Sequence, residues 1–248
     1  MNNLEIIMIA VIFIMTVASG MYPFVRRFKS QSAISFPIGE ALANGVFLGA
    51  GLIHMLGDSA SDFNDLNIDY PYPFLIAGIT ILFFLLIEHI SKTLSTKNTS
   101  NYTFMAVMAT IMLSIHSFFA GAALGLYNSH AVAIIIFIAI IGHKWAASFA
   151  LSLNINKSSF NLKFRLFLFL IFAIMSPLGI LFGDAAQTYC THTLIQPIFT
   201  AIAAGTFIYM GTLHGLDRSV MIKDCCNTKE YTFVIIGFAI MAIVAIWT

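Results

Sequence analysis

Two histidines are the side chains of this sequence best suited to metal chemistry, because each lies near the centre of a long apolar segment. His116 is followed by Ser117 in one segment, and His143 is followed by Lys144 in the next. Imidazole binds zinc and other late first-row divalent ions, and a serine hydroxyl can add a weaker oxygen ligand. Only a few residues join the two segments, so we expect antiparallel neighbouring helices with both imidazoles at one depth. The pattern predicts a metal site at the bilayer midplane with His116, His143 and Ser117 as ligands.

Lys144 is the one basic residue that the sequence places in the middle of a hydrophobic stretch. A cation in hydrocarbon costs on the order of 3 kcal/mol or more, so such a residue is a functional-site hypothesis by default. The alternative is that its side chain extends to the membrane interface. The nearest interface is distant from mid-span, which favours a role in a polar interior that excludes metal.

The composition indicates an integral membrane protein and excludes an ordinary soluble domain. Of the 248 residues, 59% are hydrophobic and 9% are charged, whereas soluble domains carry roughly 25% charged residues. The net charge of +1 gives no argument for nucleic-acid binding. Three cysteines form neither a disulfide framework nor a CxxC pair. We expect the first apolar run to be a retained span, because it lacks a basic leading region and a cleavage site.

Eight segments are apolar over the roughly 20 residues that a membrane-spanning helix needs. Their linkers are short, so we expect a single all-α transmembrane domain over residues 1–248 with no soluble module. The expected spans are residues 4–24, 40–60, 73–94, 102–127, 130–153, 163–183, 194–214 and 231–248.

The basic residues predict the orientation of these spans. All Lys and Arg residues except Lys144 lie in or beside the first, third, fifth and seventh loops, and the second, fourth and sixth loops have none. By the positive-inside rule the odd-numbered loops are cytoplasmic, which places both termini outside. A cell membrane, either a plasma membrane or a bacterial inner membrane, is the expected location.

A ten-residue pattern occurs twice, on two spans of opposite direction. Gly, Phe, Gly and His recur at the same spacing in residues 45–54 and 205–214, and Asp58 or Asp217 follows each copy. Similar sequence on antiparallel spans predicts an inverted repeat of three spans, two central spans and three spans. The alternative is a chance match in a chain rich in Gly and Phe.

Each copy of the pattern ends in a histidine with an aspartate close behind it. His54 and Asp58 are four residues apart on one helix face, so they are candidates for an outer relay by which an ion enters. His214 and Asp217 occupy the equivalent inner position, where the ion would leave. Further aspartates would extend the outer pair as an acidic stripe that concentrates cations, if they are not simply a solvated loop. The stripe comprises Asp58, Asp62, Asp65 and Asp69.

Taken together, these motifs resemble those of the ZIP family of divalent metal-ion transporters. The fourth expected span is similar to the family's H-[NS]-x-x-E-G-x-A-x-G, and the fifth resembles the branch whose motif begins His-Lys. The matching residues are His116, Ser117, Gly121 and Gly125, then His143 and Lys144. Further matches are His54-Met-Leu-Gly-Asp58, Leu86-Ile-Glu88, Ser176-Pro177-Leu178-Gly179 and Gly205-Thr-Phe-Ile-Tyr209. The resemblance covers nearly the whole chain and implies eight spans, outer termini and transport toward the cytoplasm.

Three departures from the family pattern bear on the site. The family usually has Glu four residues after the fourth-span His, and many members have one after the fifth-span His; here the residues are Ala120 and Ala147. The His-rich loop between the third and fourth spans is absent. Lys144 would also repel a dication at a second metal position. The resemblance therefore implies at most one central ion, with Lys144 blocking the second.

We expect a transporter of divalent metal ions, most simply zinc, working by alternating access or gated passage. Expected partners are the ions and the lipid bilayer, with a homodimer as the candidate assembly and no nucleic acid. One alternative is a ZIP-like protein with lost or altered metal selectivity. Another is an intramembrane metalloenzyme, which needs a general base. The sequence has no H-E-x-x-H motif and no midplane Glu or Asp, so we do not expect an enzyme.

Overall fold

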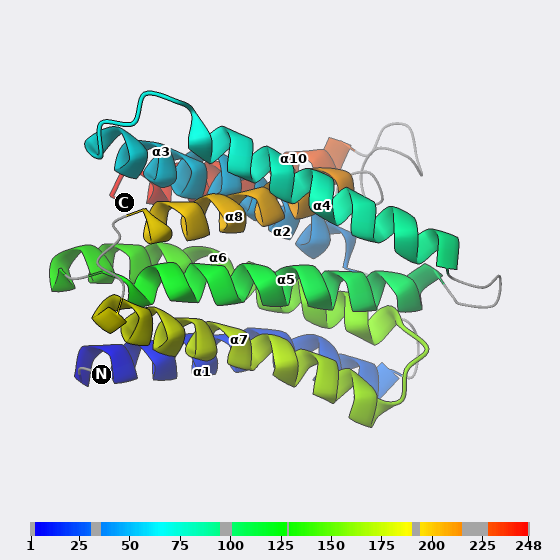
Figure 1. Cartoon of the computed structure of the whole chain (residues 1–248). Coiled ribbons are helices and arrows are strands. Elements are labelled where there is room, and N and C mark those ends of the chain that lie inside the picture. The colour runs from blue at the N-terminus through cyan, green and yellow to red at the C-terminus, as the bar shows by residue number, and fades with distance from the viewer. Residues whose placement is uncertain are drawn as a thin grey trace.

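A computed structural model of the chain is a bundle of helices, with no strand in the residues that it describes (Figure 1). These residues are 3–30, 36–94, 101–127, 129–189, 194–214 and 228–247. In chain order the helices are α1 (Asn3–Ser30), α2 (Pro37–Gly49), η1 (Ala50–Met55), α3 (Leu56–Asp65), α4 (Tyr72–Leu94), α5 (Asn101–Gly125), α6 (His130–Lys157), α7 (Leu162–Tyr189), α8 (Ile195–Tyr209), η2 (Met210–His214) and α10 (Thr228–Val244).

The helices match the expected spans closely. Seven helical runs of the described chain are long and apolar enough to cross a membrane, including the continuous run of α2, η1 and α3 and that of α8 and η2. The last helix, α10, has 17 residues, which is the lower end of the spanning range. It begins three residues before the expected eighth span and ends at Val244. The predicted class, an all-α integral membrane protein, is confirmed.

Local sequence explains where several helices begin and end. Pro37 occupies the first turn of α2, where its missing N–H costs nothing. Before α7, the Asn161 side chain accepts a hydrogen bond from the Phe164 N–H at 2.8 Å, as an N-cap does. After α3, Asn67 adopts a left-handed φ of 57°, which asparagine tolerates better than most residues. The chain thereby turns back into α4.

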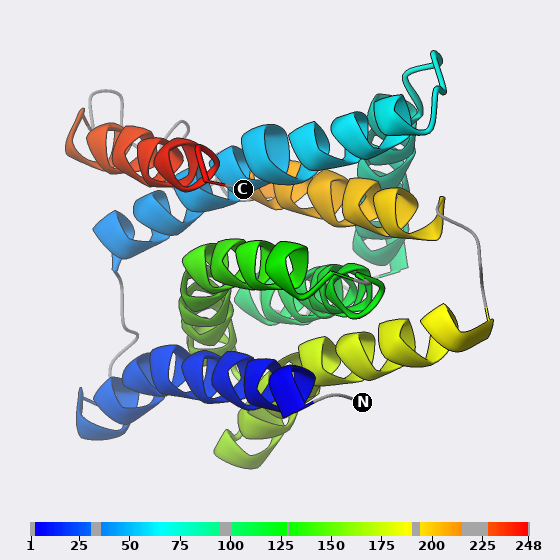
Figure 2. The same ribbon diagram turned by 90° about the vertical axis from the view of Figure 1, so that its left-hand side faces the viewer.

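The helices pack in three groups, with the predicted central pair in the middle. Figure 2 shows the central pair α5 and α6 between two outer groups, one of α1 and α7 and one of α2, α4, α8 and α10. The contacts are paired as an inverted repeat requires. Helix α1 packs on α6 as α7 packs on α5, and α2 packs on α10 as α8 packs on α4.

The repeated sequence pattern adopts the same local structure in both copies. Five residues after Gly45, the helix changes to the π-helix η1, and five residues after Gly205 it changes to η2. Single π-helical turns are rare and occur mostly at functional sites. Each ends at or next to a buried histidine, His54 or His214. The repeat therefore delivers one imidazole from each half of the molecule into the interior.

The two copies also cross each other at equivalent glycines. A Cβ added to Gly51 would lie 3.1 Å from the Ile208 nitrogen, and one added to Gly211 would lie 2.9 Å from the Leu48 nitrogen. The same separation in sequence relates Gly51 to Gly211 and Leu48 to Ile208. Both glycines thus permit close approach of the backbones at one crossing point, where small residues are favoured between membrane helices.

Candidate metal centre

The predicted ligands His116 and His143 meet in the middle of the bundle, one from α5 and one from α6. Their ring centroids are 5.6 Å apart and their planes are nearly perpendicular, at 77°. The two residues are 2% and 1% exposed. His116 Nε2 and His143 Nδ1 have no hydrogen-bond partner, although buried polar atoms usually find one. Each imidazole thus keeps a nitrogen that a bound ion could satisfy.

Helix α8 fixes the orientation of His116. Its Nδ1 lies 3.0 Å from the Ala203 carbonyl oxygen and 2.8 Å from the Thr206 hydroxyl, and its ring stacks on Phe207 with 3.4 Å between centroids. A carbonyl oxygen can only accept, so the proton of a neutral His116 belongs on Nδ1. That assignment leaves Nε2 with its lone pair, and such an outer hydrogen bond is the usual partner of a metal-binding histidine.

Lys144 is buried beside the histidine pair and has polar partners of its own. Its ammonium group donates hydrogen bonds of 2.8 Å to the hydroxyls of Ser117 and Ser176. It also lies 4.3 Å from the centre of the Phe172 ring, a cation–π arrangement. With the residue 2% exposed, the side chain does not extend to the surface. The Ser117 hydroxyl accepts one of these hydrogen bonds from Lys144. Metal binding by Ser117 stays a prediction.

A third histidine, His54 of η1, lies next to the pair. Its ring centroid is 6.5 Å from that of His143, and its Nδ1 is 2.8 Å from Asp58 Oδ2. The predicted i, i+4 pairing of His54 with Asp58 is thus present. Both residues line a small cavity of about 20 Å³ together with Ala120 and Tyr127. The sequence placed His54 on the route to the site, and the structure places it at the edge of the site.

The acidic stripe is present in part, next to this cavity. Helix α3 carries the predicted helix on to Asp65, and Asp69 lies beyond its end. Gln196 of α8 donates to Asp62 at 2.6 Å and also to the Tyr127 hydroxyl. Burial raises the pKa of Tyr127, so this hydroxyl stays protonated at physiological pH. These contacts tie α3, α8 and the residues after α5 together beside the cavity that His54 lines.

At the other end of the repeat, His214 has a carboxylate partner that the sequence did not pair with it. His214 Nδ1 lies 3.8 Å from Glu88 Oε2 on α4, and Glu88 accepts a hydrogen bond from the Tyr209 hydroxyl. Glu88 and His214 are both buried. Asp217, the predicted partner, lies outside the described residues. In the sequence, Glu88 stood out only as part of the family-like element at residues 86–88.

The candidate metal site has alanines at the two positions where the family pattern has carboxylates. Ala120 and Ala147 are buried at the positions of the two family carboxylates and supply no ligand atom. Within the described ranges, no three or more His, Cys, Asp or Glu side chains are spaced to hold a metal ion. His54 and His116 would have to move closer to His143 for the three imidazoles to coordinate one ion.

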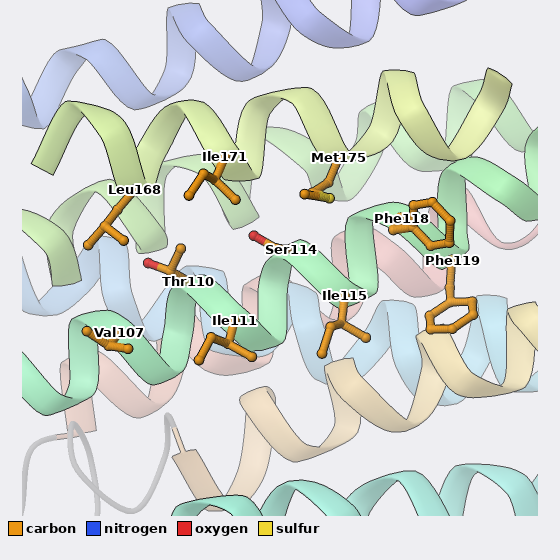
Figure 3. Close-up of a pocket in the computed structure, with 10 residues that line it drawn as sticks. All are labelled: Val107, Thr110, Ile111, Ser114, Ile115, Phe118, Phe119, Leu168, Ile171 and Met175. Atoms are coloured by element: carbon orange, nitrogen blue, oxygen red, sulfur yellow. The ribbon is translucent and has the colours of Figure 1, made fainter. Parts of the chain in front are cut away.

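A larger hollow between α5 and α7 has a different character. It has a volume of about 370 Å³ and an apolar lining apart from two hydroxyls (Figure 3). Those hydroxyls belong to Thr110 and Ser114. Without an imidazole, thiolate or carboxylate it is a poor match for a divalent ion, so the candidate metal centre is the histidine cluster.

Comparison with known proteins relates the whole chain to one family. The family model described as ZIP zinc transporter matches residues 3–104 and 93–245. The chain is 26% identical to zinc transporter ZIP2 of Mus musculus over 95% of each protein. It is 26% identical to zinc transporter 11 of Arabidopsis thaliana over 99% of this chain and 85% of that protein. Over 56% of this chain and 47% of the relative, it is 36% identical to zinc transporter ZIP1 of Danio rerio.

Proposed function

The chain belongs to the ZIP family of zinc transporters, and we propose that it moves a divalent metal ion, zinc in the first instance, toward the cytoplasm. Its family is one of transporters and not of enzymes, which removes the metalloenzyme alternative. The names of its relatives supply zinc as the first substrate to test.

The observation that carries the proposal is the buried pair of His116 and His143. Two imidazoles from neighbouring helices lie 5.6 Å apart between ring centroids, and each has a nitrogen without a hydrogen-bond partner. Nothing in a purely structural core requires two such atoms together, because each unsatisfied polar group costs about 1–3 kcal/mol. A passing divalent ion would satisfy both atoms.

Lys144 sets the number of ions in the proposed site. The ammonium group of Lys144 follows His143 directly in α6, so it repels a second dication near the histidine pair. Its hydrogen bonds to two serine hydroxyls hold it in the interior. The site is therefore proposed to hold one ion, with His116 and His143 as ligands and Ser117 as a weaker oxygen ligand.

The proposed route runs along the two copies of the repeat. The ion would enter past Asp58 and His54 and leave past His214, with Asp217 as the predicted inner carboxylate. Glu88, 3.8 Å from His214, is a further carboxylate on that side. The ion would cross by alternating access or gated passage, with both termini outside a plasma membrane or bacterial inner membrane. We expect the protein to assemble as a homodimer.

A second candidate is a ZIP-like protein whose metal selectivity has changed or whose transport has been lost. The specific observation in its favour is that both family carboxylate positions are buried alanines, Ala120 and Ala147. Removing anionic oxygen ligands weakens binding of hard divalent ions more than binding of zinc, for which imidazole suffices. The first candidate would therefore carry zinc, whereas the second would carry other ions or none.

The test is uptake of radioactive zinc by the full chain reconstituted in proteoliposomes, with protein-free vesicles as the control. We expect saturable zinc uptake in which cadmium competes better than manganese. Saturable uptake of manganese or iron with none of zinc would support altered selectivity. Absence of uptake for all four ions would overturn the proposal of transport.

A further inference from the structure

We propose that His54 is a third ligand of the transported ion and that Asp58 positions it through the opposite ring nitrogen. The inference rests on the proposed transport function, because the ion concerned is the substrate. It assigns to the second span a direct role in holding the ion and not only in admitting it.

The spacing of the rings is close to that of a coordinated set. With zinc–nitrogen bonds of 2.0–2.1 Å and tetrahedral angles, the ring centroids of two ligating imidazoles lie roughly 5 Å apart. The centroids of His116 and His143 are 5.6 Å apart, and those of His54 and His143 are 6.5 Å apart. A convergence of about 0.6 Å between His116 and His143, and of about 1.5 Å between His54 and His143, would therefore bring both pairs to that spacing.

The hydrogen bond from His54 to Asp58 selects the nitrogen that can bind the ion. The 2.8 Å separation of His54 Nδ1 from Asp58 Oδ2 places the ring proton on Nδ1, because an ionised carboxylate only accepts. Nε2 is then the metal-binding nitrogen. A carboxylate behind a ligating histidine fixes the ring and raises its basicity, as in many zinc sites. Asp58 also brings a negative charge close to the ion without contacting it.

Ala120 supplies no ligand atom to the cavity next to His54. Ala120 lines the cavity of about 20 Å³ together with His54 and Asp58, and that volume is enough for one water-sized particle. In the family pattern that Ala120 departs from, a glutamate occupies the position. The ligand and negative charge that an alanine cannot supply would thus come from His54 and Asp58, which line the same cavity.

The experiment counts imidazoles on zinc bound to the purified full-length protein, by X-ray absorption at the zinc edge, and measures zinc affinity by equilibrium dialysis. We expect three imidazoles in the wild type and two in His54→Ala, with at least a tenfold loss of affinity. Asp58→Asn should keep three imidazoles and lose about 10–100-fold in affinity. His89→Ala, which changes an exposed histidine on α4, should match the wild type and serves as the control.

A rescue variant separates ligation from a structural role. Ala120→Glu in the His54→Ala background places a carboxylate in the cavity, so it should recover most of the lost affinity. Two imidazoles on zinc in the wild type, or full affinity in His54→Ala, would overturn the inference and leave the His116 and His143 site standing. Absence of zinc binding in the wild type would overturn the inference and the proposed function together.

Discussion

Substitution of Gly121 by alanine should destabilise the protein through the contact between α5 and α7. These helices approach so closely that a Cβ on Gly121 would lie 2.5 Å from the Ser176 carbonyl oxygen, and one on Gly179 would lie 2.2 Å from that of Phe118. Backbone atoms cannot rotate away as a side chain can. The same contact holds Ser176 within reach of Lys144, so packing and the buried ammonium group depend on each other.

The close approach of the two backbones gives the size of the effect. An ordinary Cβ contact is 3.4 Å or more, so Gly121→Ala requires the helices to separate by roughly 1 Å, an overpacking that costs about 1–3 kcal/mol. For a chain of this length that corresponds to a fall in melting temperature of roughly 2–12 °C. A 1 Å shift would also stretch the 2.8 Å hydrogen bond from Lys144 to Ser176 beyond normal length.

The assay is thermal unfolding of detergent-purified variants, with Gly78→Ala as the matched control. Gly78 is also a glycine within a spanning helix, but a Cβ there would meet nothing within 4 Å. Because alanine favours helix by about 0.5–1 kcal/mol over glycine, Gly78→Ala should melt at or slightly above the wild type. Gly121→Ala combined with Gly179→Ala should cost less than the sum of the two, since one separation relieves both contacts. Gly121→Ala melting as high as Gly78→Ala would refute the reasoning.

Three further substitutions test the site. Lys144→Met should raise zinc affinity in equilibrium dialysis, because it removes a cation near the ion; an unchanged or lower affinity would count against the charge argument. Thr206→Val should lower zinc affinity about 10–100-fold by removing a hydrogen bond to His116, and wild-type affinity would show that this bond does not matter. Glu88→Gln, which weakens the Tyr209 contact and the inner negative charge, should lower maximal uptake with little change in half-saturation. A change confined to half-saturation would contradict an inner role.

Much of the fold could be predicted because, in a membrane, the position of each helix follows from its own stretch of sequence. Every backbone polar group must be satisfied within its own helix, so each long apolar run becomes a span. The short connection between α5 and α6 makes them antiparallel neighbours, which was enough to bring His116 and His143 together. The repeated pattern predicted the inverted repeat, and the structure shows that its glycines permit the close crossing of the two copies.

The rest of the site depends on helix rotation and on long-range packing, which the spacing of residues along the chain does not determine. That His54 comes within 6.5 Å of His143 depends on how η1 lies against α6. The contact of Glu88 with His214 likewise joins α4 to η2. The rotation of α6 directs Lys144 toward α7, and no pattern in the sequence indicates that direction.

Thr206 and Phe207 were also missed as partners of His116. They belong to the element Gly205-Thr-Phe, which was noted only as a repeat and as a family-like motif. Its position in the repeat, crossing the other copy, could have indicated that its side chains lie near the centre. The transition from α-helix to π-helix at Ala50 and Met210 has no comparable sequence marker, because neither segment contains proline.

The most direct test of the central claim is zinc uptake into proteoliposomes by His116→Ala and His143→Ala, beside the wild type and the exposed control His89→Ala. Equal reconstitution of all four proteins is checked by gel filtration and by the amount of protein in the vesicles. We expect saturable uptake by the wild type and the control, and loss of uptake in both His116→Ala and His143→Ala. Uptake that persists unchanged in His116→Ala and His143→Ala would contradict a route through this pair.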